Sequence, residues 1–281
     1  MTTRRFGISS HLFHDQRLGA EHLQEIARFG FDSFELFATR SHFDYHVQER
    51  IDDLGAWLVA ANLTLHAIHA PVAESFVAGK WSGIFSIGTA DEAARLRAVQ
   101  ETTRALDVAR RIPTDLLVLH PGVPAAHAVP GENSRDAVAR SVKEIAQAAG
   151  PLGVRLALEV IPNGLSSAAS LVDMLEEDLD ELDAGICLDF GHARLAGDPV
   201  DAVEAASGYL ITTHVHDNDG RRDDHRVPFD GAIDWAGTLT ATMKIGYDGA
   251  FIFEVGAAAP PRSVLERTAR ARQRFEEILG D

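Results

Sequence analysis

The stretch 210–226, LITTHVHDNDGRRDDHR, places a dense group of metal-binding side chains directly after a β-favouring run. Its imidazole and carboxylate side chains are His214, His216, Asp217, Asp219, Asp223, Asp224 and His225. Imidazole nitrogens and carboxylate oxygens at this density suit a divalent ion such as Zn, Mn or Co. A solvated acidic loop would also explain this stretch taken alone, so the case for a metal depends on the rest of the chain.

Five other apolar runs of the chain end in side chains of the same kind. These are His69, His120, Glu159, Asp189 with His192 shortly after it, and Glu254. A buried, ionised carboxylate is costly inside an apolar strand unless it is paired or bound to a metal. Together, these residues predict a metal site of one ion or more, provided that the fold brings the strand ends together.

The elements that must position these residues alternate between short apolar runs and runs with helical spacing. Strand-like runs are expected at 6–10, 31–38, 63–70, 115–120, 154–160, 185–190, 210–214 and 250–255. Helical runs are expected at 21–29, 47–61, 90–110, 134–149, 167–177, 199–206, 233–239 and 263–279. Strands apolar enough to be buried on both faces, each followed by a helix, predict one α/β domain over 1–281, a (β/α)8 TIM barrel. An open doubly wound sheet is the alternative, but no G-x-G-x-x-G turn follows an early strand.

In such a barrel the C-terminal ends of all strands meet at one mouth, where the active sites of this fold lie. We therefore expect the strand-end side chains to surround one small volume. The long segment 72–89 is a candidate wall or lid, because long loops in compact domains are usually functional; an ordinary surface excursion is the alternative. Glu35 is expected to support the site or pack in the barrel, and Cys187 to fill space.

The composition and net charge indicate which classes of binding partner suit the protein. The 281 residues carry a net charge of −16, with 46% hydrophobic and 24% charged residues, a poor match to a protein that neutralises nucleic-acid phosphates. No apolar run has the length of a membrane span, and MTTRRFGISS lacks the apolar core of a signal peptide. The single cysteine favours a cytoplasmic location. The sequence leaves the oligomeric state open.

The strand-end motifs resemble those of the xylose isomerase-like TIM barrels, a family of sugar isomerases, 3-epimerases and endonuclease-IV-type apurinic-site nucleases. They are HAP at His69, LHPG at His120, ALEV at Glu159, LDFGH at Asp189 and His192, HVHDNDGRRDDH from His214, and FIFEV at Glu254. The resemblance covers essentially the whole chain. One departure is 223–234, DDHRVPFDGAID, where the family pattern leads us to expect a glycine-rich PGxG-type turn.

The resemblance implies one divalent ion held by Glu159, Asp189, His214 and Glu254, with the two glutamates as the acid/base pair. In the nuclease branch, three zinc ions bind nine residues. Residues of all nine types occur here: His69, His120, Glu159, Asp189, His192, His214, Asp223, His225 and Glu254. The ligand set alone therefore does not choose between one ion and three.

We therefore predict a divalent-metal-dependent isomerase or epimerase of a sugar, a sugar phosphate or an inositol-type polyol. Glu159 or Glu254 would remove a proton beside a carbonyl, and the metal would stabilise the enediolate. Substrate-binding roles are expected for His192, Arg221, Arg222 and Trp81.

Three other functions remain open on the sequence. They are a multi-zinc phosphoesterase or apurinic-site nuclease, a lyase or dehydratase of the same family, and a non-catalytic sugar-binding barrel. The acidic charge and the scarcity of basic residues in the loops favour a small sugar or polyol over a nucleic acid.

Overall fold

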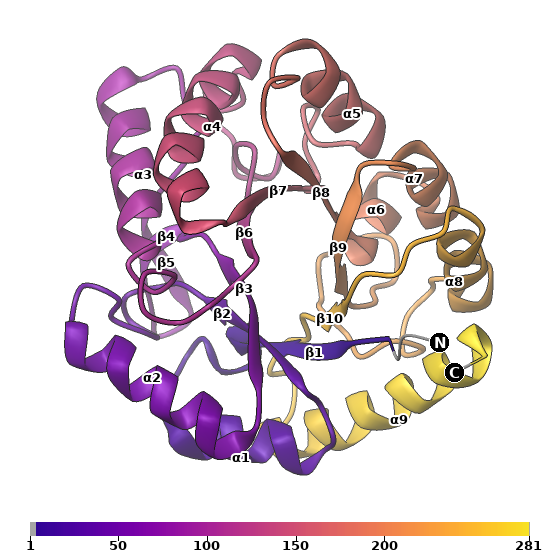
Figure 1. Cartoon of the computed structure of the whole chain (residues 1–281). Coiled ribbons are helices and arrows are strands. Elements are labelled where there is room, and N and C mark those ends of the chain that lie inside the picture. The colour runs from indigo at the N-terminus through magenta and orange to yellow at the C-terminus, as the bar shows by residue number, and fades with distance from the viewer. Residues whose placement is uncertain (1–3, 281) are drawn as a thin grey trace.

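Eight parallel strands close into a barrel, and the helices that follow them cover its outside (Figure 1). This computed structural model describes residues 4–280. The barrel strands are β1 Phe6–Ser9, β2 Ser33–Phe37, β3 Thr64–His69, β6 Leu116–Leu119, β7 Arg155–Glu159, β8 Ala184–Asp189, β9 Leu210–Val215 and β10 Phe251–Phe253. Each strand pairs with its neighbours around the ring, and β1 closes the barrel by pairing with β10 and β2. The predicted TIM barrel is confirmed.

Apart from α6, which the sequence did not predict, the helices overlap the runs where helical spacing predicted them, and the helix expected at 90–110 ends at Ala105. They are α1 Ala20–Arg28, α2 Gln48–Ala61, α3 Glu92–Ala105, α4 Arg135–Ala149, α5 Ala168–Glu177, α6 Phe190–Ala196, α7 Pro199–Ala205, α8 Trp235–Lys244 and α9 Pro261–Leu279, with short 3-10 turns at Ser10–Phe13 and Gly150–Leu152. Oxygen-bearing side chains set several starts, because they accept a hydrogen bond from a free amide of the first turn. Asp91, Ser134 and Ser167 do this for α3, α4 and α5.

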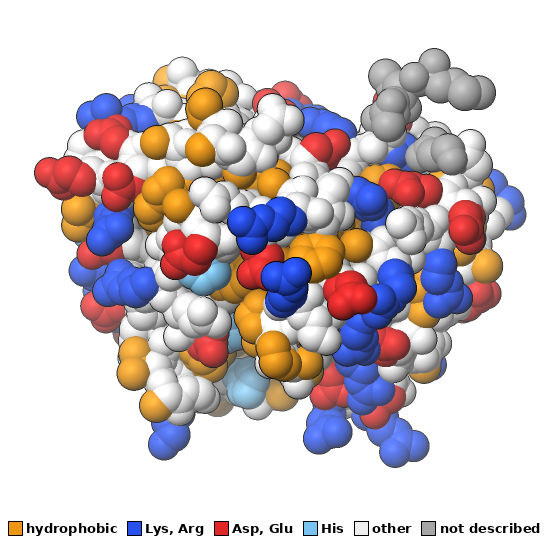
Figure 2. All heavy atoms as spheres, turned by 90° about the horizontal axis from the view of Figure 1, so that it is seen from below, with side chains coloured by type: hydrophobic (Ala, Val, Ile, Leu, Met, Phe, Trp, Pro, Cys, Tyr) orange, Lys and Arg blue, Asp and Glu red, His pale blue; other side chains and the backbone are white. Residues whose placement is uncertain are grey.

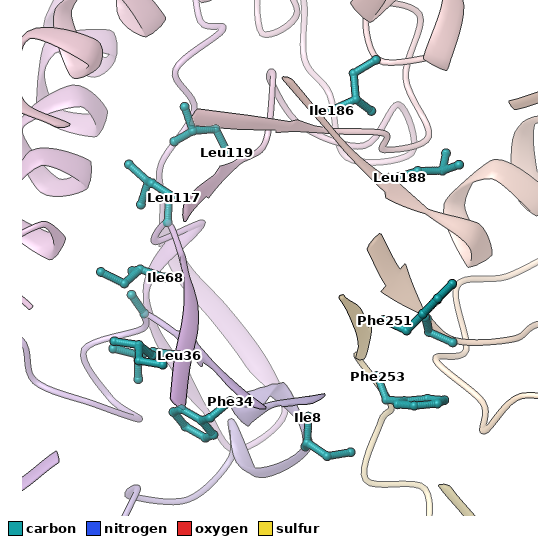
Figure 3. Packing of buried hydrophobic residues seen from close by; sticks show 14 of the residues in the cluster. Ile8, Phe34, Leu36, Ile68, Leu117, Leu119, Ile186, Leu188, Phe251 and Phe253 are labelled. Atoms are coloured by element: carbon teal, nitrogen blue, oxygen red, sulfur yellow. The ribbon is translucent and has the colours of Figure 1, made fainter. Parts of the chain in front are cut away.

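The two faces of each barrel strand pack in different places: one face packs against the helices and the other faces the inside of the barrel. Figure 3 shows apolar side chains such as Leu117, Leu119 and Leu188 pointing away from the barrel centre toward the helices. The alternate residues face inward, because side chains along a strand point to opposite faces in turn. The inward residues form a small buried cluster of Ala67, Leu116, Val118, Ala157 and Cys187. Cys187 therefore fills space in the barrel, as expected.

The inward positions next along the strands, toward their C-terminal ends, are polar. Two residues after Val118, Ala157 and Cys187 come His120, Glu159 and Asp189. The barrel register pairs Glu159 with Cys187 and Asp189 with His214. Strand alternation and register therefore place a layer of polar side chains next to the buried apolar cluster, on the side of the C-terminal strand ends.

The structure corrects two expectations about elements near the mouth. The segment 72–89 is not an irregular loop but contains a hairpin, β4 Ala73–Val77 and β5 Lys80–Ile84. Its two-residue turn holds Ala78 and Gly79 at φ 51° and 77°, the left-handed conformations that a tight hairpin turn requires. The sixth barrel strand stops at Asp189 rather than 190, because the Asp189 side chain accepts a hydrogen bond from the His192 amide and so caps α6.

Charged side chains of both signs are interspersed on the side of the molecule that Figure 2 shows, and histidines are visible between them. Within residues 4–280, no helix combines the length and apolar character needed to cross a membrane.

Candidate metal centre and active site

The ends of neighbouring strands bring Glu159, Asp189, His214 and Glu254 together at the barrel mouth. His214 Nδ1 lies 3.2 Å from Glu159 Oε1, 3.2 Å from Glu254 Oε2 and 3.9 Å from Asp189 Oδ2. All four side chains are buried, and one ligand atom from each lies within 4.8 Å of the others. The fold therefore brings together the four residues that the family resemblance implies as ligands of one ion.

Two atoms of this group have no hydrogen-bond partner among residues 4–280: Glu159 Oε1 and His214 Nδ1. They are buried and 3.2 Å apart, but their geometry does not make a hydrogen bond. An unsatisfied buried polar atom costs about 1–3 kcal/mol. A divalent cation bound by imidazole and carboxylates would satisfy both atoms, so the residues fit a metal of the Zn, Mn and Co group.

Glu35 on β2 contacts the other side of the His214 ring. Its Oε2 lies 3.0 Å from His214 Nε2, and both side chains are fully buried. A carboxylate that accepts a hydrogen bond from one ring nitrogen orients the ring and leaves the other nitrogen free for a metal. This placement agrees with a supporting role for Glu35.

Two histidines that line the cavity contact the Glu159 carboxylate. His69 Nε2 and His120 Nε2 each lie 3.1 Å from Glu159 Oε2. Burial by itself would raise the pKa of Glu159, but the charges of His120 and His214 and hydrogen bonds from histidines hold that pKa well below its usual range. Burial is likewise outweighed at Glu254, whose pKa is lowered by His214 and other histidines. Both glutamates are therefore carboxylates at neutral pH.

A second cluster of metal-ligating side chains lies beside the first: His192, His216, Asp223 and His225, with one ligand atom each within 4.8 Å. Asp223 Oδ2 lies 3.0 Å from His192 Nε2 and 3.3 Å from His225 Nε2. His216 Nε2 lies 3.0 Å from Asp189 Oδ1 and so links the two clusters. Burial would lower the pKa of His225, but the charge of Asp223 and a hydrogen bond to it raise the pKa to about 9.

Backbone carbonyls fix two rings of this second cluster. His192 Nδ1 donates to the Val160 carbonyl at 3.1 Å, and His225 Nδ1 donates to the Glu254 carbonyl at 2.7 Å. Both rings therefore present Nε2 toward Asp223, as carbonyl-bound histidines do in metal sites. His225 also adopts φ 44°, a conformation that is uncommon outside glycine and clusters at functional sites.

Two histidines of the site were assigned no individual role from the sequence, although His216 belongs to the metal-ligand-rich stretch 210–226. His216 follows β9 two residues after His214, and this spacing was the signal that both point inward. Gly191 makes room for it, because a Cβ at Gly191 would lie 2.0 Å from His216 Cε1. His11, just after β1, lines the cavity and stacks on His225 with ring centroids 4.6 Å apart. Burial lowers the pKa of His11 well below its usual value.

A cavity of about 640 Å³ borders both clusters. Residues that the sequence singled out on its polar side are His69, His120, His192, Asp223, His225 and Glu254. Trp81 of the hairpin lines it too, so the predicted wall segment borders the cavity. Arg221 and Arg222, expected to bind substrate, do not line the cavity: both are exposed on the loop. Their placement gives that expectation no support.

The loop that carries Asp223 and His225 is organised by a different acidic residue. Asp217 accepts hydrogen bonds from the Phe229 and Ile233 amides and from Trp235 Nε1, at 3.0, 3.2 and 2.8 Å. Phe229 takes φ 75° in the stretch where a glycine-rich turn was expected. Its ring packs against Trp235, which compensates for an unusual backbone conformation. Asp217 therefore stabilises the fold of this loop.

Comparisons with known proteins agree with this architecture. The family model described as "Xylose isomerase-like TIM barrel" matches residues 23–276. The uncharacterized protein MJ1311 of Methanocaldococcus jannaschii is 26% identical over 264 residues, which cover 89% of this chain and 83% of that protein.

Solved structures of the same fold include several sugar epimerases. A D-tagatose 3-epimerase-like protein superposes with a TM-score of 0.80 at 24% identity, and 98% of each chain is covered. An IolI protein with a bound zinc atom superposes with a TM-score of 0.74 at 18% identity, again covering 98% of each chain. Because the family model spans nearly the whole barrel and the strand-end residues converge as described, this chain belongs to the xylose isomerase-like TIM barrel family.

Proposed function

We propose that the protein is a divalent-metal-dependent isomerase or epimerase of a sugar or an inositol-type polyol. The observation that carries this proposal is the pair Glu159 and Glu254, two buried carboxylates each 3.2 Å from His214 Nδ1. Structural neighbours that are sugar epimerases support the same chemistry.

The two glutamates would act as the base and the acid. Both are ionised at neutral pH because nearby histidines hold their pKa values low, so either accepts a proton from a carbon beside a carbonyl. Glu254 lines the cavity, while Glu159 lies beneath His69 and His120, which line it. For epimerisation, one glutamate takes the proton from one face of the carbon. The other glutamate, once it has gained a proton from solvent, delivers that proton to the opposite face of the same carbon, and the first then releases its proton to solvent. For isomerisation, the proton is delivered to the neighbouring carbon.

The metal, held by Glu159, Asp189, His214 and Glu254, would supply Lewis-acid polarisation of the substrate carbonyl when bound. We propose one ion of Zn, Mn or Co per chain at these four ligands, and the zinc in the IolI structure of the same fold supports this choice of group. Elemental analysis of protein purified without chelator measures the number of bound metal ions per chain. About one ion per chain agrees with this proposal, and two or three zinc ions favour the second function below.

The second candidate function is a multi-zinc phosphoesterase. It is favoured by one observation, the second cluster of His192, His216, Asp223 and His225 directly beside the first. Against it, the residues that line the cavity include no lysine or arginine within the described part of the chain. A plasmid that carries abasic sites tests this function, and cleavage by the zinc-loaded protein would favour it.

The isomerase or epimerase proposal is tested by proton exchange. Metal-loaded protein is incubated in deuterated water with a panel of free ketoses and keto-inositols, and deuterium at the carbon beside the carbonyl is measured. We expect exchange by the unaltered protein and a loss of about 10²–10⁴-fold in Glu159→Gln and Glu254→Gln. Glu144→Gln is the control, because Glu144 pairs with Arg95 between α3 and α4, away from the site. Full exchange by both Gln variants, with metal still bound, would refute the assignment.

A further inference from the structure

The cavity has two chemically different sides. Its polar side carries Glu254 of the first cluster, three residues of the second cluster and the two histidines beside Glu159: His192, Asp223, His225, His69 and His120. Its other side is an apolar wall that we define as Val72, Trp81, Ile84, Phe85, Val123 and Val129. The hairpin and its flanks supply four of these residues, and the segment between β6 and α4 supplies the two valines.

The size of the cavity exceeds what one sugar ring needs. About 640 Å³ lies within the roughly 300–1,000 Å³ of pockets that enclose drug-sized ligands. A sugar whose oxygens reach the polar side would leave the apolar wall facing water. The outer members of the wall are already exposed, with Trp81 at 37%, Ile84 at 59% and Val129 at 61%. Contiguous exposed apolar side chains that are rimmed by polar groups are typical of ligand-binding grooves and other interaction surfaces.

The charges of the cavity disfavour an anionic substituent on the substrate. Three lining residues are acidic, Glu132, Asp223 and Glu254, and none of the described lining residues is lysine or arginine. The histidines His192 and His225 already share Asp223, at 3.0 and 3.3 Å. A phosphate is typically bound by arginine, lysine or a row of backbone amides, so this cavity suits a neutral ligand.

The aromatic surface of the wall suits a flat ring. Trp81 is stacked on His14 with centroids 5.5 Å apart and an interplanar angle of 11°, and Phe76 supports it from the side. These contacts already hold the indole of Trp81 in place. Little side-chain conformational entropy is therefore lost when a ligand ring packs on it.

We propose that the natural ligand is an unphosphorylated sugar or polyol that carries an aromatic or other apolar substituent. The sugar end lies against the clusters, and the substituent lies against the apolar wall. This substrate class rests on the proposed sugar chemistry of the site, but it concerns binding and is measured without turnover.

The test uses Mn-loaded full-length protein and calorimetric titration with matched probes. The probes are the phenyl and methyl β-glycosides of D-glucose, D-galactose and D-xylose, together with D-glucose 6-phosphate. We expect at least one phenyl glycoside to bind ten-fold or more tightly than its methyl partner. We expect D-glucose 6-phosphate to bind more weakly than that phenyl glycoside.

Two wall variants and one matched control test whether the phenyl group contacts the apolar wall. Trp81→Ala and Val129→Ser are expected to reduce the phenyl preference to about three-fold or less while leaving methyl glycoside affinity unchanged. Val59→Ser is the control, because Val59 on α2 is 81% exposed and does not line the cavity. Circular dichroism and the metal content check that each variant is folded and loaded.

Several results would overturn the proposal. These are equal affinity for phenyl and methyl glycosides, no binding of any phenyl glycoside, tighter binding of the phosphate, or a phenyl preference that survives in both wall variants. A change of oligomeric state in the wall variants without a change in binding would assign the wall to a contact between copies of this chain. Failure of proton exchange with an intact phenyl preference would refute the proposed reaction and leave this substrate class standing.

Discussion

Glu35 and His214, 179 residues apart in the chain, meet inside the barrel with Glu35 Oε2 3.0 Å from His214 Nε2. His214 is thereby held between a carboxylate below and two glutamates above, which lie 3.2 Å from its Nδ1. The arrangement makes one ring nitrogen a hydrogen-bond donor and leaves the other for a metal.

Replacing Glu35 should therefore weaken metal binding although none of the proposed metal ligands is changed. We expect Glu35→Gln to lower metal affinity by about 10–100-fold, because outer carboxylates raise the basicity of a metal-binding histidine. Chelator-competition titration measures the affinity directly. Glu101→Gln is a matched control, because Glu101 lies 2.9 Å from His46 in another Glu–His pair, outside the two clusters. Unchanged affinity in Glu35→Gln would show that Glu35 only packs in the barrel.

Gly191 and His216 should be energetically coupled. A Cβ at Gly191 would lie 2.0 Å from His216 Cε1, so Gly191→Ala must displace a fully buried ring, and we expect it to destabilise the protein by about 1–3 kcal/mol. His216→Ala removes the ring and frees the space. Urea unfolding of both single variants and the double variant should therefore give a coupling energy of about 0.5–3 kcal/mol. Additive effects would mean that the two residues do not share this space.

Two buried histidines outside the proposed ligands should make the protein acid-sensitive. Burial lowers the pKa of His42 and of His66 from 6.5 to about 4. The unfolded chain therefore binds more protons than the folded chain between pH 6.5 and 4, and stability falls as the pH falls through this window. For His42 alone the loss at pH 5 is about 2 kcal/mol, because one pKa unit corresponds to about 1.4 kcal/mol.

His42→Gln tests this expectation. The drop in unfolding free energy between pH 7 and pH 5 should be smaller in the variant than in the unaltered protein by about 2 kcal/mol. Urea titrations at both pH values, on metal-free protein, give the two drops. An identical drop would mean that His42 titrates in the folded state as it does in the unfolded chain.

Metal removal should lower thermal stability. An ion that binds the folded state stabilises it by about 2.7 kcal/mol at a free concentration of one hundred times its Kd. We expect dialysis against EDTA to lower Tm and added Zn, Mn or Co to restore it. In Asp189→Asn the restoration should be small, because one of the four proposed ligands loses its charge. Equal Tm values with and without metal would contradict binding at this site.

Sequence periodicity predicted the barrel because each strand and helix is marked locally. All eight barrel strands lie within the runs expected from apolar patterning, allowing for ends shifted by a residue or two. The hairpin β4–β5 was missed because its residues are largely exposed. All five residues of β5 are solvent-exposed, so burial imposes no pattern on them. Helix α6 was missed because its start is set by Asp189, which the sequence marked only as a strand end.

The sequence by itself determined which side chains stand at the strand ends, since a residue's place on its own strand depends on local spacing. Only the tertiary structure decided which of them meet and through which atoms. The closure and register of the barrel pair Asp189 with His214 and bring Glu35 beneath the same ring. The backbone carbonyls of Val160 and Glu254 decide which nitrogen His192 and His225 present. Such distances depend on how separate strands align around the whole barrel, and no local pattern of residues encodes that alignment.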